Sequence, residues 1–306
     1  MNVIGVDIGG TGVKGAIISK EAEILQEVKV STNIAEGREG ILRSVVSVID
    51  SLFRNNIPIS GIGLGSAGRI DPQKGEVVYA TANLPNWEGT NLKAFLEKKY
   101  EVESYIENDA NTALLGEMWA GATHKKQIET VVMLTLGTGV GGATAINGKI
   151  LNGNKFQSGE WGHVILVPHG KSCNCGKEGC IEQYLSGTAL THAVRTETEF
   201  QFTHGAEIFE AYSDGNKQVK KVVDRYIDYL AIVIYNITVA IDPQAILIGG
   251  GLIDSKAHWW HDLENKLRTM DVTTAVLPAS LGNKAGMFGA AAMALQHVIE
   301  KRGESV

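Results

Sequence analysis

The N-terminal part of the chain alternates between apolar runs rich in branched residues and turns rich in glycine. Val3–Ile8 and Val13–Ile18 lie on either side of one such turn, and Glu23–Val30 alternates apolar and polar positions, as strands do. Gly40–Phe53 instead repeats its apolar residues at helical spacing. The pattern predicts a meander of three strands followed by an amphipathic helix.

The layout of strand, glycine-rich turn and strand returns at Thr130–Leu136 and Ala143–Ile150. No internal sequence identity accompanies it, so the predicted symmetry is one of architecture. The remaining predicted elements are the strands Ile62–Leu64, Val102–Ile106 and Ala245–Ile248, and the helices Leu92–Lys99, Ala110–Trp119, Lys217–Ala240 and Met287–Glu300. The mixture predicts an α/β fold with a domain boundary near residue 120, the last helix returning to the first domain.

Composition narrows the functions that this fold can carry. The chain has 306 residues, 44% apolar and 20% charged, with a formal net charge of −6. This length suits two domains or one large one. An acidic balance without a basic run argues against a nucleic-acid or anionic-membrane surface. No signal peptide is visible at Met1–Gly5, and the longest apolar stretch, Tyr229–Ile241, is too short to span a bilayer.

All three cysteines, Cys173, Cys175 and Cys180, lie within eight residues, and His163 precedes the first by ten. Three thiolates and one imidazole form a closed tetrahedral shell for a structural zinc ion. Two glycines inside the cluster let the backbone turn back on itself. His169 is a second imidazole that can take the place of His163, and three unrelated buried thiols are the alternative to a metal. The spacing suits a metal better than disulfides, which predicts a reducing cytoplasm.

Two carboxylates flank this cluster. Glu160 precedes His163, and Glu182 follows Cys180. A metal that holds the loop would also hold both carboxylates, which is how a rigid polar binding pocket is made.

Polar residues also bracket the first glycine turn. Asp7 and Lys14 lie on either side of Gly9, Gly10 and Thr11. Glycines allow a close approach of the backbone, whose N–H groups can point at phosphate oxygens. Asp7 would face a phosphate-bound Mg²⁺ through water, while the threonine and the lysine would donate to phosphate. A plain hairpin turn is the alternative.

The second glycine turn matches the letters G-x-G-x-x-G through Gly137, Gly139 and Gly142. A dinucleotide fingerprint needs a helix after the glycines, whereas Ala143–Ile146 predicts a strand that meets the hairpin signal Asn147-Gly148. A second hairpin that holds phosphate is therefore expected. A Walker loop is excluded because no Gly-Lys-Ser/Thr run occurs.

Two further motifs follow predicted strands. Gly249, Gly250 and Gly251 would let a flat base or ribose lie against the backbone, although such glycines are also common in turns. Asp109 comes directly before a predicted helix, where an aspartate is often an N-cap. Alternatively it is a general base for an alcohol that Asn108 orients, kept ionised by the helix N-terminus.

Taken together, these motifs resemble the superfamily of sugar kinases, actin and heat-shock chaperone ATPases. Within it, Glu160-x-x-His163 followed by Cys-x-Cys-Gly-x-x-Gly-Cys-x-Glu resembles the ROK family of bacterial sugar kinases and repressors, over essentially the whole chain. The resemblance implies a two-domain ribonuclease-H-like fold with a cleft between the domains and a small zinc-bound loop. The expected domains are 1–120 plus 288–306, and 121–287.

The resemblance also implies an activity, the transfer of phosphate from Mg-ATP to the 6-hydroxyl of a hexose, an N-acetylhexosamine or a β-glucoside, by a cytoplasmic homodimer. It implies Asp109 as the base, and Asn108, Glu160, His163 and Glu182 as sugar ligands. The implied ATP-binding residues are Asp7, Gly9, Gly10, Thr11, Lys14, Gly137, Thr138, Gly139, Gly141, Gly249, Gly250 and Gly251. The implied zinc ligands are His163, Cys173, Cys175 and Cys180.

Other functions within the same superfamily each leave one feature of the sequence unexplained. ROK repressors carry an N-terminal winged helix, but the aspartate of the phosphate loop is already residue 7 here, which leaves no room for one. A sugar sensor without turnover would not need Asp109, and a chaperone-like ATPase would not need the zinc segment. Gly65–Gly68 departs from the proline-bearing turn of glucose-specific members, which favours amino sugars or β-glucosides. Trp87, in the loop from Asn83, could contact the substrate or pack the domain edge.

Overall fold

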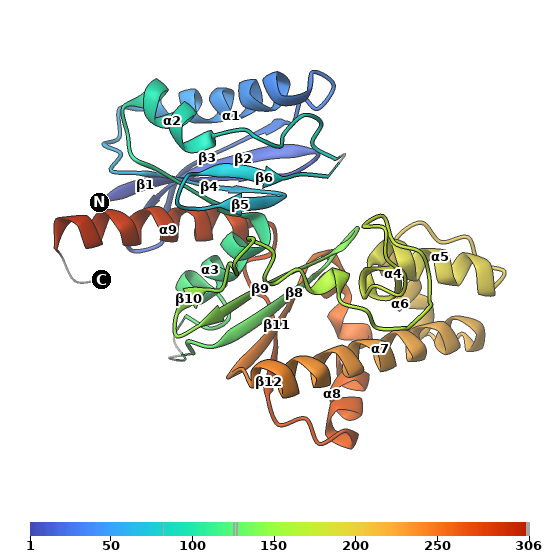
Figure 1. The fold of residues 1–306 in the computed structure, drawn as a ribbon. Coiled ribbons are helices and arrows are strands. Elements are labelled where there is room, and N and C mark those ends of the chain that lie inside the picture. The colour runs from blue at the N-terminus through green and yellow to red at the C-terminus, as the bar shows by residue number, and fades with distance from the viewer. Residues whose placement is uncertain (82, 125, 127, 304–306) are drawn as a thin grey trace. The chain divides into compact units, whose positions relative to one another are not determined.

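Two five-stranded mixed sheets form the frame of the protein, seen in a computed structural model that describes residues 1–81, 83–124, 126 and 128–303 (Figure 1). The chain divides into two compact units. Unit 1 comprises Met1–Gln127, Asn152–Gln157 and Asn283–Val306, and unit 2 comprises Ile128–Leu151 and Ser158–Gly282. Residues 304–306, the end of the predicted range 288–306, lie outside the described residues.

The sheet of unit 1 has the strand order β3-β2-β1-β4-β7. Its strands are β1 (Asn2–Ile8), β2 (Gly12–Ser19), β3 (Ile24–Ser31), β4 (Ile62–Ser66) and β7 (Ser104–Asn108), and a separate hairpin consists of β5 (Arg69–Asp71) and β6 (Glu76–Tyr79). The first three strands are antiparallel, whereas β4 and β7 run parallel to β1. The parallel register aligns Ile8 with Ser66 and Ser66 with Asn108, so three strands end at one edge of the sheet.

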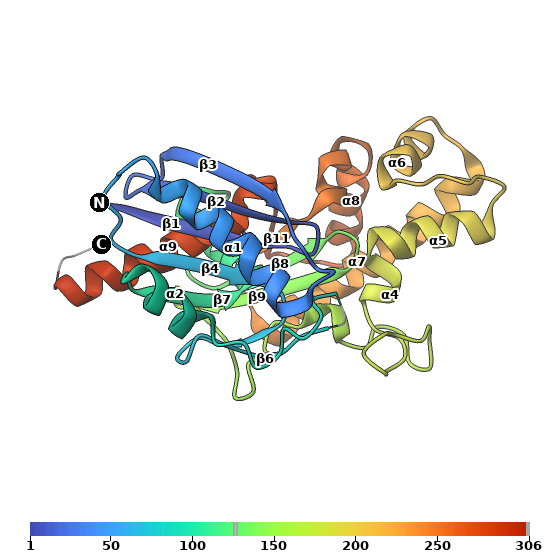
Figure 2. The same ribbon diagram turned by 90° about the horizontal axis from the view of Figure 1, so that it is seen from above.

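Helices cover both faces of this sheet. They are α1 (Gly37–Phe53), α2 (Leu92–Tyr100), α3 (Asp109–Ala120) and α9 (Ala285–Arg302). α1 and α2 bury their apolar sides with Ile4, Val6 and Ile8 and lie over the sheet in Figure 2, while α9 lies against the opposite face (Figure 1). Ordinary side chains would not fit beneath α9, because a Cβ at Gly63 would lie 1.7 Å from the Ala290 carbonyl oxygen.

The sheet of unit 2 repeats the same order as β10-β9-β8-β11-β12. Its strands are β8 (Val131–Leu136), β9 (Val140–Ile146), β10 (Lys149–Ile150), β11 (Ala245–Gly249) and β12 (Ala275–Pro278). Its helices are α4 (Glu182–Leu185), α5 (Gly187–Glu197), α6 (Gly205–Ser213), α7 (Lys217–Ile241) and α8 (Trp260–Thr269), with 3₁₀ turns at Trp161–His163 and Gly251–His258. Another 3₁₀ turn, Gly282–Lys284, begins at the last residue of unit 2 and continues into unit 1. Val132, Leu134 and Leu136 pack with the buried side of α7 in a core separate from that of unit 1.

The predicted α/β class and the recurring strand–turn–strand layout are confirmed. Several boundaries were wrong. The strand expected at Val102–Ile106 is Ser104–Asn108, and the single strand expected at Ala143–Ile150 is two strands around Asn147-Gly148. Both of those hairpin residues have positive φ, as the Asn-Gly signal indicates. The glycine turn after β8 is also shorter than expected, since β9 already begins at Val140.

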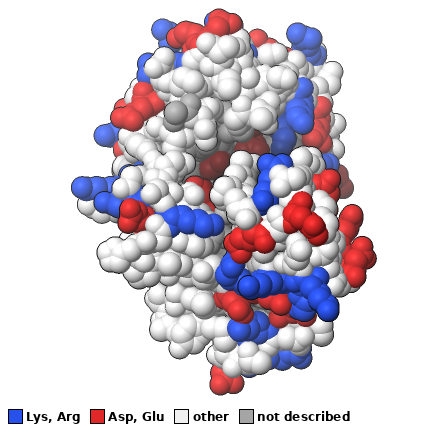
Figure 3. Space-filling view, turned by 90° about the vertical axis from the view of Figure 1, so that its right-hand side faces the viewer, with Lys and Arg blue, Asp and Glu red and all other residues white. Residues whose placement is uncertain are grey.

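Charged residues of both signs are interspersed over the described surface that Figure 3 shows. Ion pairs such as Lys220–Asp224 and Arg225–Glu197 join opposite charges locally. No helix in the described part of the chain is long and apolar enough to cross a membrane.

Candidate active site and metal centre

Two acidic residues of unit 1 lie at the edge where β1, β4 and β7 end. Asp7 is the penultimate residue of β1, and Asp109 follows directly after β7. Burial and, after it, the charge of Asp109 raise the pKa of Asp7. In open α/β sheets the carboxyl ends of parallel strands are where ligands bind.

Asp7 lies in a crowded, half-buried place. Its pKa is raised from 3.8 to about 6, mainly by burial and also by the charge of Asp109, while the Lys14 ammonium acts in the opposite direction. Lys14 is the direct cross-strand partner of Asp7 on β2, and its Nζ also donates to the Asn283 carbonyl oxygen at 3.3 Å. Gly286 of α9 leaves room for the carboxyl group, because a Cβ there would lie 2.8 Å from the Asp7 Cγ.

The turn between β1 and β2 is a tight glycine hairpin. The Gly9 N–H donates to the Gly12 carbonyl oxygen at 3.0 Å, and the Thr32 hydroxyl donates to the Gly9 carbonyl oxygen at 2.6 Å. Gly10 and Thr11 form its exposed tip, and no atom would meet a Cβ at Gly10 within 4 Å. A ligand can therefore approach the backbone of this tip closely.

The N-cap of α3 is Asn108, and not Asp109 as one interpretation of the sequence had it. The Asn108 Oδ1 accepts from the N–H groups of Ala110 and Asn111 at 2.9 and 3.1 Å, and its Nδ2 donates to the Gly68 carbonyl oxygen at 2.8 Å. Asp109 is the first residue of the helix, and its Oδ1 accepts from the Ala110 N–H at 2.9 Å. The positive end of the helix dipole favours an ionised carboxylate at this position.

In unit 2 the corresponding turn is Gly137–Gly139. The Gly137 N–H donates to the Gly139 carbonyl oxygen at 3.0 Å, and the Gly137 carbonyl accepts from the Gly187 N–H at the start of α5. The Thr188 hydroxyl donates to the Thr138 carbonyl at 2.8 Å. Gly141 lies within β9 and not in the turn.

Glu182 joins this turn to the cysteine loop. Its Oε2 accepts from the Val140 N–H at 3.0 Å, and a Cβ at Gly139 would lie 2.4 Å from the same oxygen. Glu160 and His163 lie at the 3₁₀ turn packed on β9, where a Cβ at Gly162 would lie 2.0 Å from the Val140 carbonyl oxygen. The glycines of this region thus make room for the neighbouring loop as well as for any phosphate.

Gly249, Gly250 and Gly251 end β11 and begin the following 3₁₀ turn. Gly250 has a φ of 84° and lies against the backbone of Leu136, the last residue of β8, where a Cβ would come within 2.4 Å of the carbonyl oxygen. A Cβ at Gly251 would meet no atom within 4 Å. The first two glycines serve the fold, and the third is open to a ligand.

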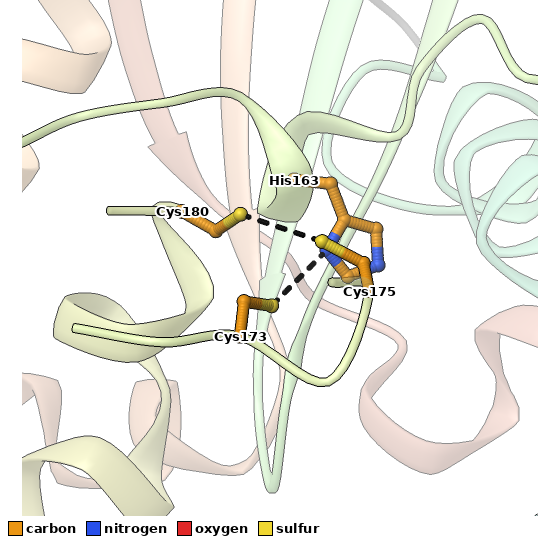
Figure 4. A group of neighbouring side chains, drawn as sticks. All are labelled: His163, Cys173, Cys175 and Cys180. Atoms are coloured by element: carbon orange, nitrogen blue, oxygen red, sulfur yellow. Dashed lines mark hydrogen bonds between the residues drawn. The ribbon is translucent and has the colours of Figure 1, made fainter. Parts of the chain in front are cut away.

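The three cysteines and His163 come together in one cluster (Figure 4). Their ligand atoms all lie within 4.8 Å of one another, with 3.6 Å between Cys175 Sγ and Cys180 Sγ and 3.7 Å between His163 Nδ1 and Cys173 Sγ. Zinc–sulfur bonds of about 2.3 Å in a tetrahedron place two sulfurs roughly 3.8 Å apart. The donor set therefore fits a zinc ion, and the group includes His163 and not His169.

The backbone of this loop agrees with a metal site. Gly176 and Gly179 both have positive φ, which confirms the expected turns. Burial and the adjacent thiols raise the pKa of the Cys180 thiol to about 12. A divalent cation between the sulfurs stabilises thiolates and reverses this shift. Figure 4 shows one ring nitrogen of His163 beside the sulfurs and the other on the opposite side of the ring.

A profile of the ROK family matches residues 3–297, which is nearly the whole chain. The chain belongs to the ROK family. Among its ROK relatives, the glucokinase of Halalkalibacterium halodurans is 34% identical over 94% of this chain and 92% of its own length. The N-acetyl-D-glucosamine kinase of Citrobacter koseri is 32% identical over 94% of this chain and 97% of its own length.

A solved ROK structure shows the same fold. The ROK family glucokinase from Streptomyces griseus, in complex with glucose and AMPPNP, superposes with a TM-score of 0.81 at 29% identity, covering 97% of this chain and all of the other. The expected sugar and ATP residues are divided between the units. Unit 1 holds Asp7, Gly9, Gly10, Thr11, Lys14, Asn108 and Asp109, and unit 2 holds Gly137, Thr138, Gly139, Gly141, Glu160, His163, Glu182, Gly249, Gly250, Gly251 and the three cysteines.

Sequence reasoning missed one buried carboxylate beside the site of this ROK chain. Glu107 is 5% exposed and accepts hydrogen bonds from Asn108, Asn111 and Asn152. The letters Glu-Asn-Asp were visible, but nothing in them shows that the first points inward. The open question about Trp87 is also answered, because its side chain is fully buried in the core of unit 1 and its Nε1 donates to the Ser66 hydroxyl at 2.9 Å.

Proposed function

We propose that this ROK protein is an ATP-dependent sugar kinase that transfers the γ-phosphoryl group to the 6-hydroxyl of a sugar. The observation that carries the proposal is the placement of Asp109 on the first turn of α3, at the sheet edge that also bears Asp7 and its glycine hairpin. A carboxylate that accepts a proton and a hairpin that accepts phosphate are the two parts that such a transfer needs. Relatives that span the whole chain are sugar kinases by name.

Asp109 is the general base in this proposal. It removes the proton from the sugar 6-hydroxyl as the oxygen attacks the γ-phosphorus, and the bond to the leaving oxygen of ADP breaks. The helix N-terminus keeps the carboxylate ionised at neutral pH, and a positioned base contributes roughly 10²–10⁴-fold to the rate. Asn108, Glu160, His163 and Glu182 bind the sugar hydroxyls. Glu182 has one oxygen on the Val140 N–H, so the other is the one assigned to the sugar.

The phosphates of ATP are assigned to the two glycine hairpins and to Lys14. Asp7 is suited to hold the waters around the Mg²⁺ that accompanies ATP, because that ion keeps several waters and prefers oxygen ligands. The positive charge of the Mg²⁺ offsets the free-energy cost of ionising Asp7 beside Asp109. Gly251, at the open end of β11, is the place for the base or ribose. AMPPNP, which is bound in the Streptomyces griseus relative, is an ATP analogue and supports ATP as the donor.

The zinc ligands have a structural task in this proposal. His163, Cys173, Cys175 and Cys180 would hold the ion, which closes the loop between Glu160 and Glu182. The ribonuclease-H-like, actin-like ATPase architecture is assigned to the two units, whose sheets share one strand order. The residues assigned to the reaction are divided between the units. A homodimer and a cytoplasmic location belong to the same proposal. The oligomeric state is tested by light scattering.

The sugar is proposed only as a class, namely a hexose, an N-acetylhexosamine or a β-glucoside. The glucokinase and the N-acetyl-D-glucosamine kinase relatives are 34% and 32% identical, so identity does not rank their substrates for this chain. A sensor that binds sugar without turnover and a chaperone-like ATPase are the alternatives. Turnover of ATP that depends on sugar separates all three.

The test is ADP release from Mg-ATP with glucose, N-acetylmannosamine, N-acetylglucosamine, allose, fructose, gentiobiose and cellobiose. Strong activity with one sugar is expected and names the substrate. Silence with every sugar, while sugar and ATP still bind, would make the sensor the better interpretation. ADP release without sugar would favour the chaperone-like ATPase.

Asp109→Asn tests the base directly. We expect it to lower kcat by roughly 10²–10⁴-fold while the unfolding temperature and the sugar affinity stay close to wild type, because asparagine has nearly the same shape. Asp214→Asn, the same change at the exposed C-terminus of α6, is the matched control. Near-normal turnover of Asp109→Asn would contradict the assignment.

A further inference from the structure

Glu107, the penultimate residue of β7, just before α3, is a buried carboxylate to which the proposed mechanism gives no task. Its Oε1 accepts from the Asn108 backbone N–H at 2.7 Å and from Asn111 Nδ2 at 3.0 Å, and its Oε2 accepts from Asn152 Nδ2 at 2.8 Å. An ionised carboxylate only accepts hydrogen bonds, so three N–H donors match that form. Burial raises the pKa of Glu107, and the three donors lower it.

These contacts hold the start of α3 from both sides. Asn108 is the N-cap and immediately precedes Asp109, and Asn111 lies one turn further on. The Thr112 hydroxyl donates to the Asp109 carbonyl at 2.8 Å, which fixes the same turn. The residues Asn108 and Asn111, on either side of the proposed base, are thus tied to one side chain.

The third contact reaches a separate stretch of chain. Asn152–Gln157, here called the strap, belongs to unit 1, although the segments before and after it in sequence belong to unit 2. Asn152 is the first residue of the strap and is half-buried. The sequence runs from the strap directly into Ser158–His163, which contains the proposed sugar ligands Glu160 and His163.

We propose that Glu107 is a positioning residue for phosphoryl transfer and that Asn152 is the partner through which the strap takes its place beside the start of α3. This inference rests on the proposed function. Displacement of a reacting group by about 1 Å costs on the order of 10²-fold in rate. Loss of the Glu107–Asn152 pairing therefore lowers kcat more than it weakens the binding of the sugar.

The test exchanges the two functional groups. Glu107→Gln turns an amide donor toward the amide of Asn152, and Asn152→Asp places two carboxylates against each other. The double variant Glu107→Gln/Asn152→Asp restores one donor facing one acceptor, with the amide and the carboxylate exchanged. Asn154→Asp, an exposed residue of the same strap, is the matched control for the added charge.

Steady-state kinetics with the sugar identified in the panel decide the matter. Each single variant is expected to lower kcat by about tenfold or more, with a smaller change in the KM for sugar. The double variant is expected to recover most of the loss, and Asn154→Asp to resemble wild type. A purely structural task for Glu107 predicts normal kcat below the unfolding temperature. That result, or a double variant no better than the singles, overturns the proposal.

Amide hydrogen exchange gives a readout that does not depend on turnover. Exchange in the peptide that spans the start of α3 is expected to speed up in Glu107→Gln and to slow again in the double variant. Unchanged exchange in Glu107→Gln would also overturn the proposal. Should wild type phosphorylate no sugar, the proposed function fails. The exchange measurement still tests whether the contacts of Glu107 hold the start of α3. Should Glu107→Gln fail to fold, Asn152→Ala at its half-buried position gives the same kinetic comparison.

Discussion

At the scale of single residues, Asp7 shows a conflict between stability and function. Its pKa lies at about 6 in the fold against an ordinary 3.8, because burial and Asp109 oppose its charge. Folding therefore favours the protonated carboxyl. The stability that the protonated form contributes is complete below about pH 4 and is lost as the pH rises through 6. A carboxylate whose ionised form destabilises the fold indicates a ligand that binds to its negative charge.

Asp7→Asn is expected to stabilise the protein without Mg²⁺ and nucleotide at pH 7.5 while lowering kinase activity. The difference between 3.8 and about 6 corresponds to roughly 3 kcal/mol at most. At pH 4 the gain should vanish, because wild type is then protonated as well. Urea unfolding at both pH values measures this, with Asp214→Asn as the exposed control. A gain that is equal at both pH values would show that the pKa of Asp7 is ordinary.

At the scale of elements, the contact between α3 and α9 depends on the absence of side chains. A Cβ at Gly289 would lie 1.5 Å from the Thr112 carbonyl oxygen, and one at Gly116 would lie 2.2 Å from that of Ala285. Both obstacles are backbone atoms, which cannot turn aside. The helix that carries Asp109 is therefore seated against α9 as closely as two helices allow.

Gly289→Ala should destabilise unit 1 and reduce activity together. The gain in helix propensity is about 1 kcal/mol, whereas overpacking costs about 1–3 kcal/mol and more where backbones must separate, so a net loss near 2 kcal/mol is expected. Gly251→Ala, where a Cβ meets nothing within 4 Å and φ is not positive, is the control for stability. Denaturant midpoints of both variants measure the effect, and a stabilised Gly289→Ala would mean that the helices are further apart.

At the scale of the whole molecule, stability is divided between two cores, one in each unit. The zinc site belongs to unit 2 alone, and structural zinc contributes directly to folding free energy. Loss of the metal should consequently act on one unit before the other.

Cys175→Ser, or treatment with a chelator, is expected to remove about one zinc per chain and to lower the first unfolding transition in calorimetry. The second transition, from unit 1, should change less. Lys177→Ser, an exposed change in the same loop, should keep both the metal and the transition. Equal metal content and an unchanged thermogram in Cys175→Ser would refute the zinc site.

The sequence by itself determined the α/β class, most of the strands and helices, the family, and the cluster of His163 with three cysteines. Each of these depends on local signals. Apolar periodicity reports which face is buried, glycines report turns, and ligands of one metal can lie close together in the chain. Even so, local signals placed the start of β9 wrongly, since its pairing with β8 decides that boundary. They also left open whether Asp109 is the N-cap of α3, a position that Asn108 takes.

Only the tertiary structure decided which groups share an environment. Trp87 proved to be a core residue, because its side chain is fully buried. Its indole meets the hydroxyl of Ser66, which is not a neighbour in the sequence. Glu182 reaches the second glycine turn, and Glu107 meets an asparagine forty-five residues later. The raised pKa of Asp7 likewise comes from Asp109 and from burial beneath α9. Burial and charge interactions depend on distances in space between residues of different elements. The sequence of one strand or helix does not determine those distances.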